Sequence, residues 1–318
     1  MHMKTVFLGT SWESVEALKV LHNDPYFEIV CVITSPDKPV GRKQILSKSD
    51  VKIFAEKAKI PVVHTESNRE KYNEVLKKYK PEIGVCKAFG EIVPNEFLEN
   101  LRYGCINIHF SILPKYRGAV PIQKAILNGE KETGISIMLM SQNLDEGDVL
   151  KISKEKIKKD DTNITLRKRL VNRSSKILIP TLKDWINGKI TPQKQDHSKA
   201  TYCWQKDISK EKAKILWNNY EPEYIERMVR ALLPWPIAWT EWNRKRIQIF
   251  DVDIVKCDEQ GNPGDLIVRE NSLLFKTINN ERCINVKELK IEGKKKMTTI
   301  EALRGKTFAQ AHSKPDSV

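Results

Sequence analysis

Short apolar runs alternate with amphipathic segments along residues 1–130. The apolar runs have the length and the β-branched content of buried strands, and they lie at residues 4–10, 27–34, 60–65, 82–89 and 105–110. Between them, apolar residues recur at the spacing of a helix face, at residues 11–21, 49–59, 69–79 and 118–129. Strand–helix alternation of this kind predicts an α/β domain with a doubly wound, mostly parallel sheet, that is, a Rossmann-like core.

The pattern changes after residue 133. Residues 133–140 and 147–157 predict a pair of antiparallel strands, and residues 162–187 predict one long amphipathic helix. Residues 190–208 are polar and lack apolar periodicity, which is typical of a linker. We therefore expect a first domain over residues 1–189, followed by this linker.

The C-terminal part, residues 209–318, is built differently. One helix-like segment, PEYIERMVRALL, precedes several strand-sized runs, and turn signals such as DEQGNPG separate these runs. Short strands at this spacing are typical of a small β-barrel. We expect a smaller C-terminal domain with an OB-like β-barrel fold.

Composition excludes several classes of protein. Hydrophobic residues make up 40% of the 318 residues and charged residues 30%, the balance of a globular protein with a buried core. No apolar run approaches the roughly 20 residues that a membrane-spanning helix needs. The apolar stretch near the N-terminus is too short for the core of a signal peptide. We expect a cytoplasmic protein without membrane attachment.

The cysteines are scattered and form no C-x-x-C pair. The first three lie inside apolar strand-like runs, where a thiol usually acts as a small buried hydrophobe. Because metal-ligand spacing is also lacking, we expect structural burial rather than a metal or redox role, and no metal site. The residues concerned are Cys31, Cys86, Cys105, Cys203, Cys257 and Cys283.

The chain is strongly basic, with a formal net charge of +14. The excess is spread out, at +9 over residues 1–190 and +5 over residues 191–318. A basic surface attracts polyanions such as nucleic acid, but a lysine-rich surface also keeps a protein soluble. Charge alone therefore leaves both interpretations open.

A polar cluster ends the strand-like run at residues 105–110. Alternation along a strand puts Asn107, His109 and Ser111 on one side, and doubly wound sheets bind ligands outside the carboxyl ends of their strands. An amide and an imidazole at that rim can donate hydrogen bonds to a developing oxyanion, and the imidazole can move a proton. A solvent-facing strand end would carry the same residues.

Asp145 is a further candidate catalytic residue, beside Asn107 and His109. It lies in the turn NLDEGD, between two predicted strands. By itself, an aspartate in such a place is usually a turn residue. Paired with His109, its carboxylate could orient the imidazole and raise the pKa of the ring.

The ordered set of motifs closely resembles the 10-formyltetrahydrofolate-dependent formyltransferase family over nearly the whole chain. Residues 104–123 read GCINIHFSILPKYRGAVPIQ, similar to the family's G-x-I-N-x-H-x-S-L-L-P-x-[WY]-R-G-A-A-P-I-Q, and residues 143–148 match its L-D-[TEA]-G-D. Residues 34–42 resemble its T-x-P-D-[KR]-P-x-G-R loop, and residues 85–94 its V-x-A-Y-G-x-I-L-P. The polar loop and the second domain resemble the members whose formyl acceptor is methionyl-initiator-tRNA.

The resemblance implies transfer of a formyl group from 10-formyltetrahydrofolate to the free amino group of the methionyl-tRNA. By that resemblance, Asn107, His109 and Asp145 would form the catalytic triad. Asn107 and protonated His109 would stabilise the oxyanion that forms when the amine attacks the formyl carbon. Asp145 would position His109 and help to remove the proton.

The resemblance also implies binding residues. Arg42 and Lys43, in the polar loop, would contact the acceptor end of the tRNA, and an OB-like barrel would suit nucleic acid. Initiator methionyl-tRNA and folate would thus be the partners of a monomeric enzyme, with no metal and no membrane. The folate site would be lined by Cys86, Lys87, Ala88, Phe89, Gly90, Ile92, Ser111, Ile112, Leu113 and Pro114.

The chain departs from the family pattern in its ligand loops. Ser11 stands where the family has Pro, and the usual aromatic near it is shifted to Trp12. Phe89 replaces Tyr, Ile112 replaces Leu, and an additional Lys87 precedes the loop alanine. These changes concern the folate loop and the first loop, and none falls on the triad.

Three alternatives share part of this pattern. A sugar-nucleotide N-formyltransferase has the same catalytic core with an amino sugar as acceptor, but the polar loop with Arg42 and the second basic domain argue against it. A formyl-folate hydrolase or dehydrogenase module also shares the core, but we expect no appended oxidation domain here. A non-catalytic RNA-binding protein would bind RNA through its positive charge, and His109 would then have no catalytic role.

Overall fold

The computed structural model describes residues 2–40, 44–305 and 308, and the chain forms two compact units. Unit 1 holds the chain up to residue 118 together with residues 133–156 and 168–202. Unit 2 holds residues 119–132, residues 157–167 and the chain from residue 203.

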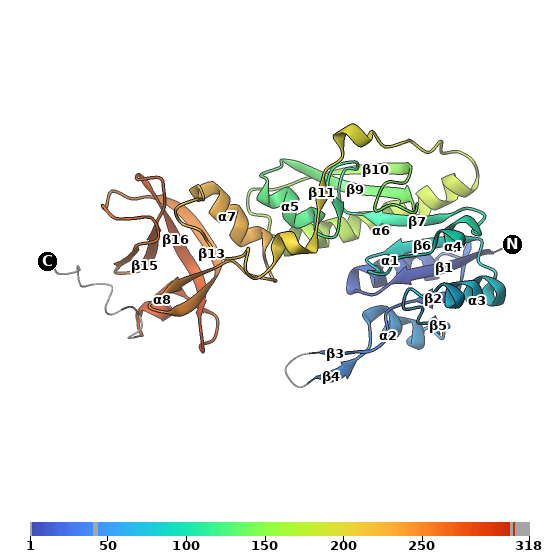
Figure 1. Ribbon diagram of the computed structural model, residues 1–318, viewed down its shortest axis with the longest axis horizontal. Coiled ribbons are helices and arrows are strands. Elements are labelled where there is room, and N and C mark those ends of the chain that lie inside the picture. Colours follow the sequence, from blue (N-terminus) through green and yellow to red (C-terminus); the bar gives the residue numbers. More distant parts are fainter. Residues whose placement is uncertain (1, 41–43, 306–307, 309–318) are drawn as a thin grey trace. The chain divides into compact units, whose positions relative to one another are not determined.

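A mixed sheet forms the centre of unit 1, and within the described residues it has seven strands in the order β10-β9-β7-β6-β1-β2-β5 (Figure 1). The strands β1, β2, β5, β6 and β7 pair in parallel, whereas β9 is antiparallel to β7. The expected mostly parallel sheet is therefore confirmed. Its strands are β1 (Met3–Gly9), β2 (Phe27–Ile33), β5 (Val62–Val63), β6 (Ile83–Lys87), β7 (Cys105–His109), β9 (Glu132–Leu139) and β10 (Val149–Lys156).

The helices expected between these strands are present. Local capping explains where one of them starts, because the Ser49 hydroxyl accepts a hydrogen bond from the backbone N–H of Lys52 at 3.0 Å. The long helix expected over residues 162–187 also forms. The helices are α1 (Trp12–Asn23), α2 (Asp50–Lys57), α3 (Arg69–Tyr79), the short α4 (Asn95–Glu99) and α6 (Asn163–Ile186).

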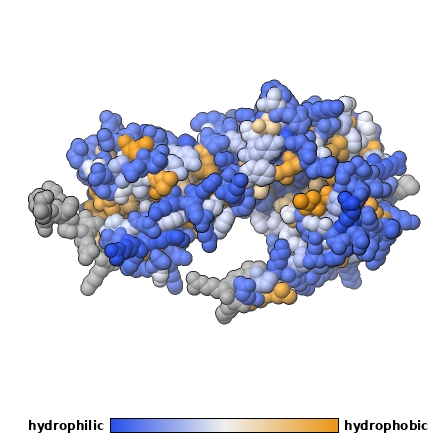
Figure 2. All heavy atoms as spheres, viewed as in Figure 1, coloured by the Kyte–Doolittle hydropathy of each residue, from blue (hydrophilic) through white to orange (hydrophobic). Residues whose placement is uncertain are grey.

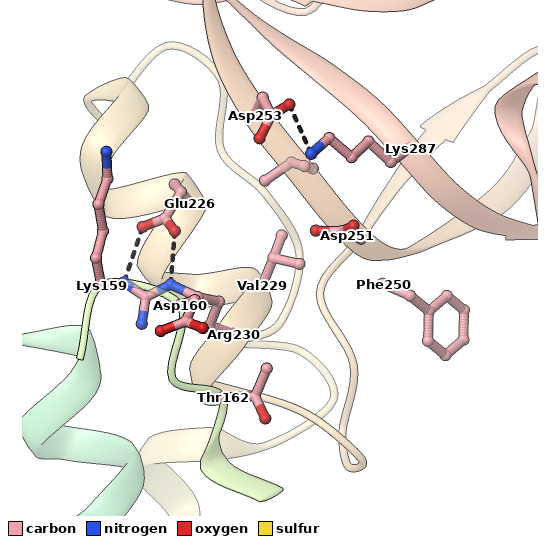
Figure 3. Close-up of a pocket in the computed structure, with 11 residues that line it drawn as sticks. Lys159, Asp160, Thr162, Glu226, Val229, Arg230, Phe250, Asp251, Asp253 and Lys287 are labelled. Atoms are coloured by element: carbon pink, nitrogen blue, oxygen red, sulfur yellow. Dashed lines mark hydrogen bonds and ion pairs between the residues drawn. The ribbon is translucent and has the colours of Figure 1, made fainter. Parts of the chain in front are cut away.

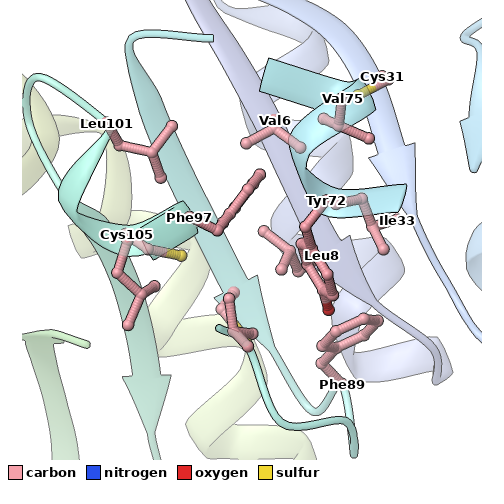
Figure 4. Close-up of a cluster of buried hydrophobic side chains, with 13 residues drawn as sticks. Val6, Leu8, Cys31, Ile33, Tyr72, Val75, Phe89, Phe97, Leu101 and Cys105 are labelled. Carbon is pink, nitrogen blue, oxygen red and sulfur yellow. The ribbon is translucent and has the colours of Figure 1, made fainter. Parts of the chain in front are cut away.

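One face of this sheet packs against α3 and α4 to form a hydrophobic core (Figure 4). Val6 and Leu8 of β1 lie beside Ile33 of β2, and all three are fully buried. Tyr72 and Phe97 close the core edge-to-face, with ring centroids 5.0 Å apart. The core reaches Cys86 and Phe89, so it supports the carboxyl end of β6, where the loop expected to bind folate begins.

Some short elements were not anticipated from the pattern. A small hairpin pairs β3 (Lys38–Val40) with β4 (Ile45–Ser47). The predicted linker carries the turn η1 (His197–Lys199), the two-residue strand β11 (Tyr202–Cys203) and the turn η2 (Gln205–Ile208). The strand β8 (Arg117–Gly118) pairs with β11. These segments are too short for an alternation signal.

Unit 2 is built around a strongly curled antiparallel sheet (Figure 1). Its strand order is β12-β13-β16-β15-β14, with β17 paired to β16. This curled sheet agrees with the expected smaller C-terminal domain with an OB-like β-barrel fold. The elements are α5 (Pro121–Leu127), α7 (Pro222–Ala231), β12 (Trp239–Trp242), β13 (Lys245–Lys256), β14 (Leu266–Arg269), β15 (Ser272–Lys276), β16 (Arg282–Ile291), β17 (Met297–Thr298) and α8 (Thr299–Leu303).

The expected burial of the cysteines is confirmed for all six, but two of them are not free thiols. Cys31, Cys86, Cys105 and Cys203 are buried free thiols. Cys257 and Cys283 instead form a disulfide, with a Cα–Cα distance of 5.5 Å. The cause is the register of β13 and β16, which brings together two cysteines that are 26 residues apart in the sequence.

Figure 2 shows a mostly hydrophilic face with small scattered hydrophobic patches, as expected for a chain with 30% charged residues. In the part of the chain that the structure describes, no helix is long and apolar enough to cross a membrane.

Candidate active site

The candidate site lies at the carboxyl end of β7. Asn107 pairs with Met138 of β9 and with Cys86 of β6, and His109 pairs with Ser136 of β9. The Asn107 side chain is half-buried and the His109 ring is buried. Because β7 ends at His109, the expected alternation does not extend to Ser111.

Asp145 brings these two side chains together. Its Oδ1 accepts a hydrogen bond from Nδ2 of Asn107 at 3.2 Å, and its Oδ2 lies 3.5 Å from Nδ1 of His109. The backbone N–H of Gly118 donates to the same Oδ2 at 2.8 Å. The three residues expected from the resemblance thus form one contiguous polar cluster, although Asp145 lies far from the other two in the sequence.

The hydrogen-bond partners of His109 define its resting tautomer. Nε2 lies 2.9 Å from the carbonyl oxygen of Tyr116, and because a carbonyl only accepts, Nε2 must carry the hydrogen. Burial lowers the pKa of the ring, while the charge of Asp145 and the Tyr116 carbonyl raise it and the charge of Lys87 lowers it. The net direction is downward, so the resting ring is neutral and its Nδ1 lone pair faces Asp145.

This arrangement can hold a proton and stabilise an anion. Nδ1 of His109 and Oδ2 of Asp145 are both acceptors in the resting state, so a proton that arrives there is shared between two bases. The second hydrogen of the Asn107 amide is not needed for Asp145 and can be donated to a nearby oxyanion. The cluster therefore has the parts for acyl or formyl transfer to a nucleophile.

The loop expected to bind folate leaves the sheet beside this cluster. Cys86 and Lys87 are buried at the end of β6, and Phe89 is packed into the core. Ala88 and Gly90 are exposed, and both have positive φ angles. Two residues of the loop are thus exposed, while Phe89 anchors the loop between them.

The remaining folate candidates are placed less uniformly. Ile92 is 82% exposed, the largest exposure among the large hydrophobic residues described. Ser111 is fully buried, and its hydroxyl donates to the carbonyl of Lys115 at 2.6 Å. Leu113 is also buried, next to Met138, whereas Ile112 and Pro114 are half-buried.

Lys87 places a buried positive charge beside the candidate site. Its Nζ donates to the carbonyl of Ile108 at 3.0 Å, lies 3.8 Å from a carboxylate oxygen of Glu13, and sits 3.1 Å from the centroid of the Phe110 ring. Through these contacts, the last residue of β6 touches Ile108 and Phe110, the residues before and after His109 in the sequence. The same charge lowers the pKa of His109.

Replacing Lys87 with methionine should raise the pKa of His109. The substitution removes a positive charge that disfavours the imidazolium, and the pH at which the ring takes a proton therefore moves upward. A titration of the His109 ring signals by nuclear magnetic resonance measures this directly. Lys77→Met, an exposed substitution on α3, is the control, and an equal pKa in wild type and Lys87→Met would contradict the assignment.

The residues expected to contact tRNA, Arg42 and Lys43, lie outside the described residues. No group of His, Cys, Asp and Glu side chains among the described residues is arranged to hold a metal ion.

A separate cleft of about 350 Å³ lies in unit 2, between α7, β13 and the segment before α6 (Figure 3). In Figure 3, Arg230 pairs with Glu226, and Lys287 pairs with Asp253. Four carboxylates and three cationic side chains line this cleft, so it offers no excess of positive charge for a phosphate. The chemistry described above is confined to unit 1.

Comparison of the sequence with family models identifies the family of this chain. The model of the formyl transferase domain matches residues 3–182, and the model of the formyl transferase C-terminal domain matches residues 207–307. The chain belongs to the formyl transferase family.

Two individual relatives are similar to this chain over nearly its whole length. The chain is 40% identical over 304 residues to the methionyl-tRNA formyltransferase of Halalkalibacterium halodurans, covering 95% of each chain. It is 41% identical over 308 residues to the methionyl-tRNA formyltransferase of Caldicellulosiruptor saccharolyticus, covering 95% of this chain and 97% of the relative.

Solved structures share the fold. An N-formyltransferase from Helicobacter canadensis, in complex with folinic acid and dTDP-3-aminofucose, superposes with a TM-score of 0.66 at 20% identity, over 89% of this chain and 99% of that one. HypX from Aquifex aeolicus, in complex with tetrahydrofolic acid, gives a TM-score of 0.61 at 15% identity over 97% of this chain. The chain spans about half the length of HypX, 48%.

Proposed function

We propose that the chain transfers a formyl group from 10-formyltetrahydrofolate to the free amino group of methionyl-initiator-tRNA. The observation that carries this proposal is the contact of the Asp145 carboxylate with both Asn107 and His109, at 3.2 and 3.5 Å. Relatives of about 40% identity over nearly the full length support the choice of acceptor.

The proposed mechanism assigns one task to each side chain. The acceptor amine attacks the formyl carbon, and the Asn107 amide donates a hydrogen bond to the oxyanion that develops. The His109–Asp145 pair takes the proton that the amine loses, which gives a ring with a hydrogen on both nitrogens and a positive charge near the oxyanion. When the bond to N10 of the folate breaks, His109 returns the proton to that nitrogen, so protons and bonds balance.

The folate would be held by the loop at residues 86–92 and the turn at residues 111–114. Ala88 and Gly90 are exposed, and the buried Phe89 between them keeps the loop in place. The backbone groups of this loop suit the amide-like edge of a pterin. When bound, the folate supplies the activated formyl group. The chain supplies the hydrogen-bond donor, the proton acceptor and the dry surroundings.

The tRNA would be bound outside this cluster. We propose that Arg42 and Lys43 contact its acceptor end, and that the domain at residues 209–318 binds it. Residues 190–208 are the linker in this proposal. A net charge of +14 favours such a partner. In this proposal the catalytic domain spans residues 1–189, and the enzyme acts as a monomer in the cytoplasm.

A formylation assay separates this proposal from its nearest alternative. Labelled 10-formyltetrahydrofolate is offered with methionyl-initiator-tRNA, with a dTDP-amino sugar, or with buffer alone. We expect label on the tRNA and not on the elongator methionyl-tRNA used as a control. Label on the sugar with unformylated tRNA would favour a sugar N-formyltransferase, and formyl release in buffer alone would favour a hydrolase.

Arg42→Ala should weaken use of tRNA while sparing the chemical step. A phosphate contact from arginine adds about one unit to the slope of log affinity against log salt, and this slope should fall by that amount in the variant. Turnover with a small methionyl amine should stay near wild type. Arg102→Ala, at an exposed arginine, is the matched control, and equal losses on both acceptors would argue against a tRNA role for Arg42.

A further inference from the structure

Gln195 lies in the polar segment without periodicity, yet its side chain is buried. Its Nε2 donates two hydrogen bonds of 2.8 Å, one to the carbonyl of Asp145 and one to the carbonyl of Gly147. Its Oε1 accepts from Nε and Nη2 of Arg117, at 3.1 and 2.9 Å. Because arginine can only donate and a carbonyl can only accept, the amide can take just one orientation.

The turn that Gln195 holds does not sit in a relaxed backbone conformation. Asp145 has a φ angle of 52°, in the left-handed region that few non-glycine residues adopt. At Gly147, a Cβ atom would lie 1.9 Å from the carbonyl oxygen of Leu139, so only glycine fits there. The two hydrogen bonds from Gln195 therefore fix the backbone on both sides of the Asp145 side chain.

Arg117, which orients the Gln195 amide, is itself fixed by further contacts. Its guanidinium is fully buried, forms an ion pair with Glu146 at 2.9 Å and donates to the hydroxyl of Tyr202 at 3.2 Å. A buried charge needs such partners. The next residue, Gly118, donates its backbone N–H to the Asp145 carboxylate. The short strand β8 therefore holds Asp145 in two ways. Gly118 binds its carboxylate, and Arg117 binds Gln195, which in turn binds its backbone carbonyl.

The same polar segment also supports the partner of His109. The backbone N–H of Arg117 donates to the carbonyl of Thr201 at 2.8 Å, and the N–H of Tyr116 donates to the Thr201 hydroxyl at 2.9 Å. The carbonyl of Tyr116 is the acceptor for Nε2 of His109. Residues 195–201 thus contact the supports of both members of the acid–base pair.

We propose that Gln195 and Arg117 are positioning residues for the reaction: the Arg117 guanidinium orients the Gln195 amide, and the amide holds the Asp145 turn so that its carboxylate faces Asn107 and His109. The inference rests on the proposed formyl transfer. It assigns a function in the site to a segment that the sequence presents only as a linker.

Two substitutions at Gln195 test the proposal. Gln195→Glu keeps an acceptor for Arg117 but has no hydrogen to donate to the two carbonyls, and Gln195→Leu removes both functions. We expect kcat for formylation to fall about 10²-fold in each, the scale for misplacing a catalytic group by about 1 Å, with KM for both substrates changed less than about threefold. Gln193→Leu, at an exposed glutamine two residues earlier, should stay at the wild-type rate.

A titration of His109 by nuclear magnetic resonance gives a readout that does not depend on activity. The charge of Asp145 raises the pKa of His109, so a carboxylate that moves away in Gln195→Leu should lower that pKa. Tyr202→Phe, which removes an exposed hydroxyl from Arg117 and Glu146, should shift the pKa in the same direction by less. Circular dichroism checks that each variant folds.

The outcomes are distinguishable. A wild-type enzyme that leaves tRNA unformylated refutes the proposed function, while the His109 titration still decides the positioning role. A wild-type rate in folded Gln195→Glu together with an unchanged His109 pKa in folded Gln195→Leu refutes the positioning role alone. A loss confined to KM would also overturn it, because it would place Gln195 in substrate binding instead.

Discussion

Replacing Asn107 with alanine should lower kcat roughly 10²–10³-fold, the scale for losing one preorganised donor to an oxyanion. The Asn107 amide is the neutral donor of the cluster, and its hydrogen bond to Asp145 aims it. Its side chain is only half-buried, the one residue of β7 that is not fully buried, so the fold should survive the change. Stopped-flow measurement of a single turnover isolates the chemical step from product release.

The controls for this prediction separate catalysis from folding. Asn187→Ala removes an exposed amide just after α6 and should leave kcat unchanged. His109→Ala should lose at least about 10²-fold as well, since it removes a proton acceptor. If Asn107→Ala and His109→Ala both turned over near the wild-type rate with intact folds, the proposed mechanism would have to be abandoned.

The pattern of apolar residues was sufficient to predict the elements of the core. The helix expected over residues 162–187 spans Asn163–Ile186, and the strand expected over residues 105–110 spans Cys105–His109. The helix has apolar positions at the helical period over 24 residues, which is the strongest local signal, and the strand is a short, mostly apolar run. The hairpin of β3 and β4 was missed because three-residue strands with exposed apolar side chains carry no such signal.

Contacts set by tertiary register could not be predicted from local pattern. The disulfide between Cys257 and Cys283 depends on how β13 aligns with β16, and a shift of the pairing would separate the two residues. A search for closely spaced cysteines cannot detect it. The same limit explains why alternation grouped Ser111 with His109, although the chain turns away before that residue.

Only part of the candidate site could be predicted from the sequence. Asn107 and His109 share a strand, so their common side follows from alternation. The contact with Asp145 spans 38 residues of sequence, and only the family resemblance indicated it. Gln195 gave no signal, because a buried amide in a polar, aperiodic segment has the same composition as an exposed one.

Asp145→Asn should be the most damaging conservative change in the chain, lowering kcat on the order of 10⁴-fold, the scale for losing the carboxylate partner of a catalytic histidine. The carboxylate accepts from Asn107 on one oxygen and from Gly118 on the other. An asparagine has one acceptor oxygen and one NH₂ group, so one of these two donors would face another donor. The misplaced amide would also donate to Nδ1 of His109 and keep the ring from taking a proton.

The pH dependence gives this prediction a second signature. Burial lowers the pKa of His109, and Asp145 and the Tyr116 carbonyl raise it, so removing the carboxylate leaves only the Tyr116 carbonyl against burial and the pKa falls further. Any residual activity that needs the neutral ring should then persist to lower pH than in wild type. Asp148→Asn changes a half-buried carboxylate of the same turn and should alter neither kcat nor the pH profile. An Asp145→Asn enzyme with a wild-type profile would show that the His109–Asp145 pair does not hold the transferred proton.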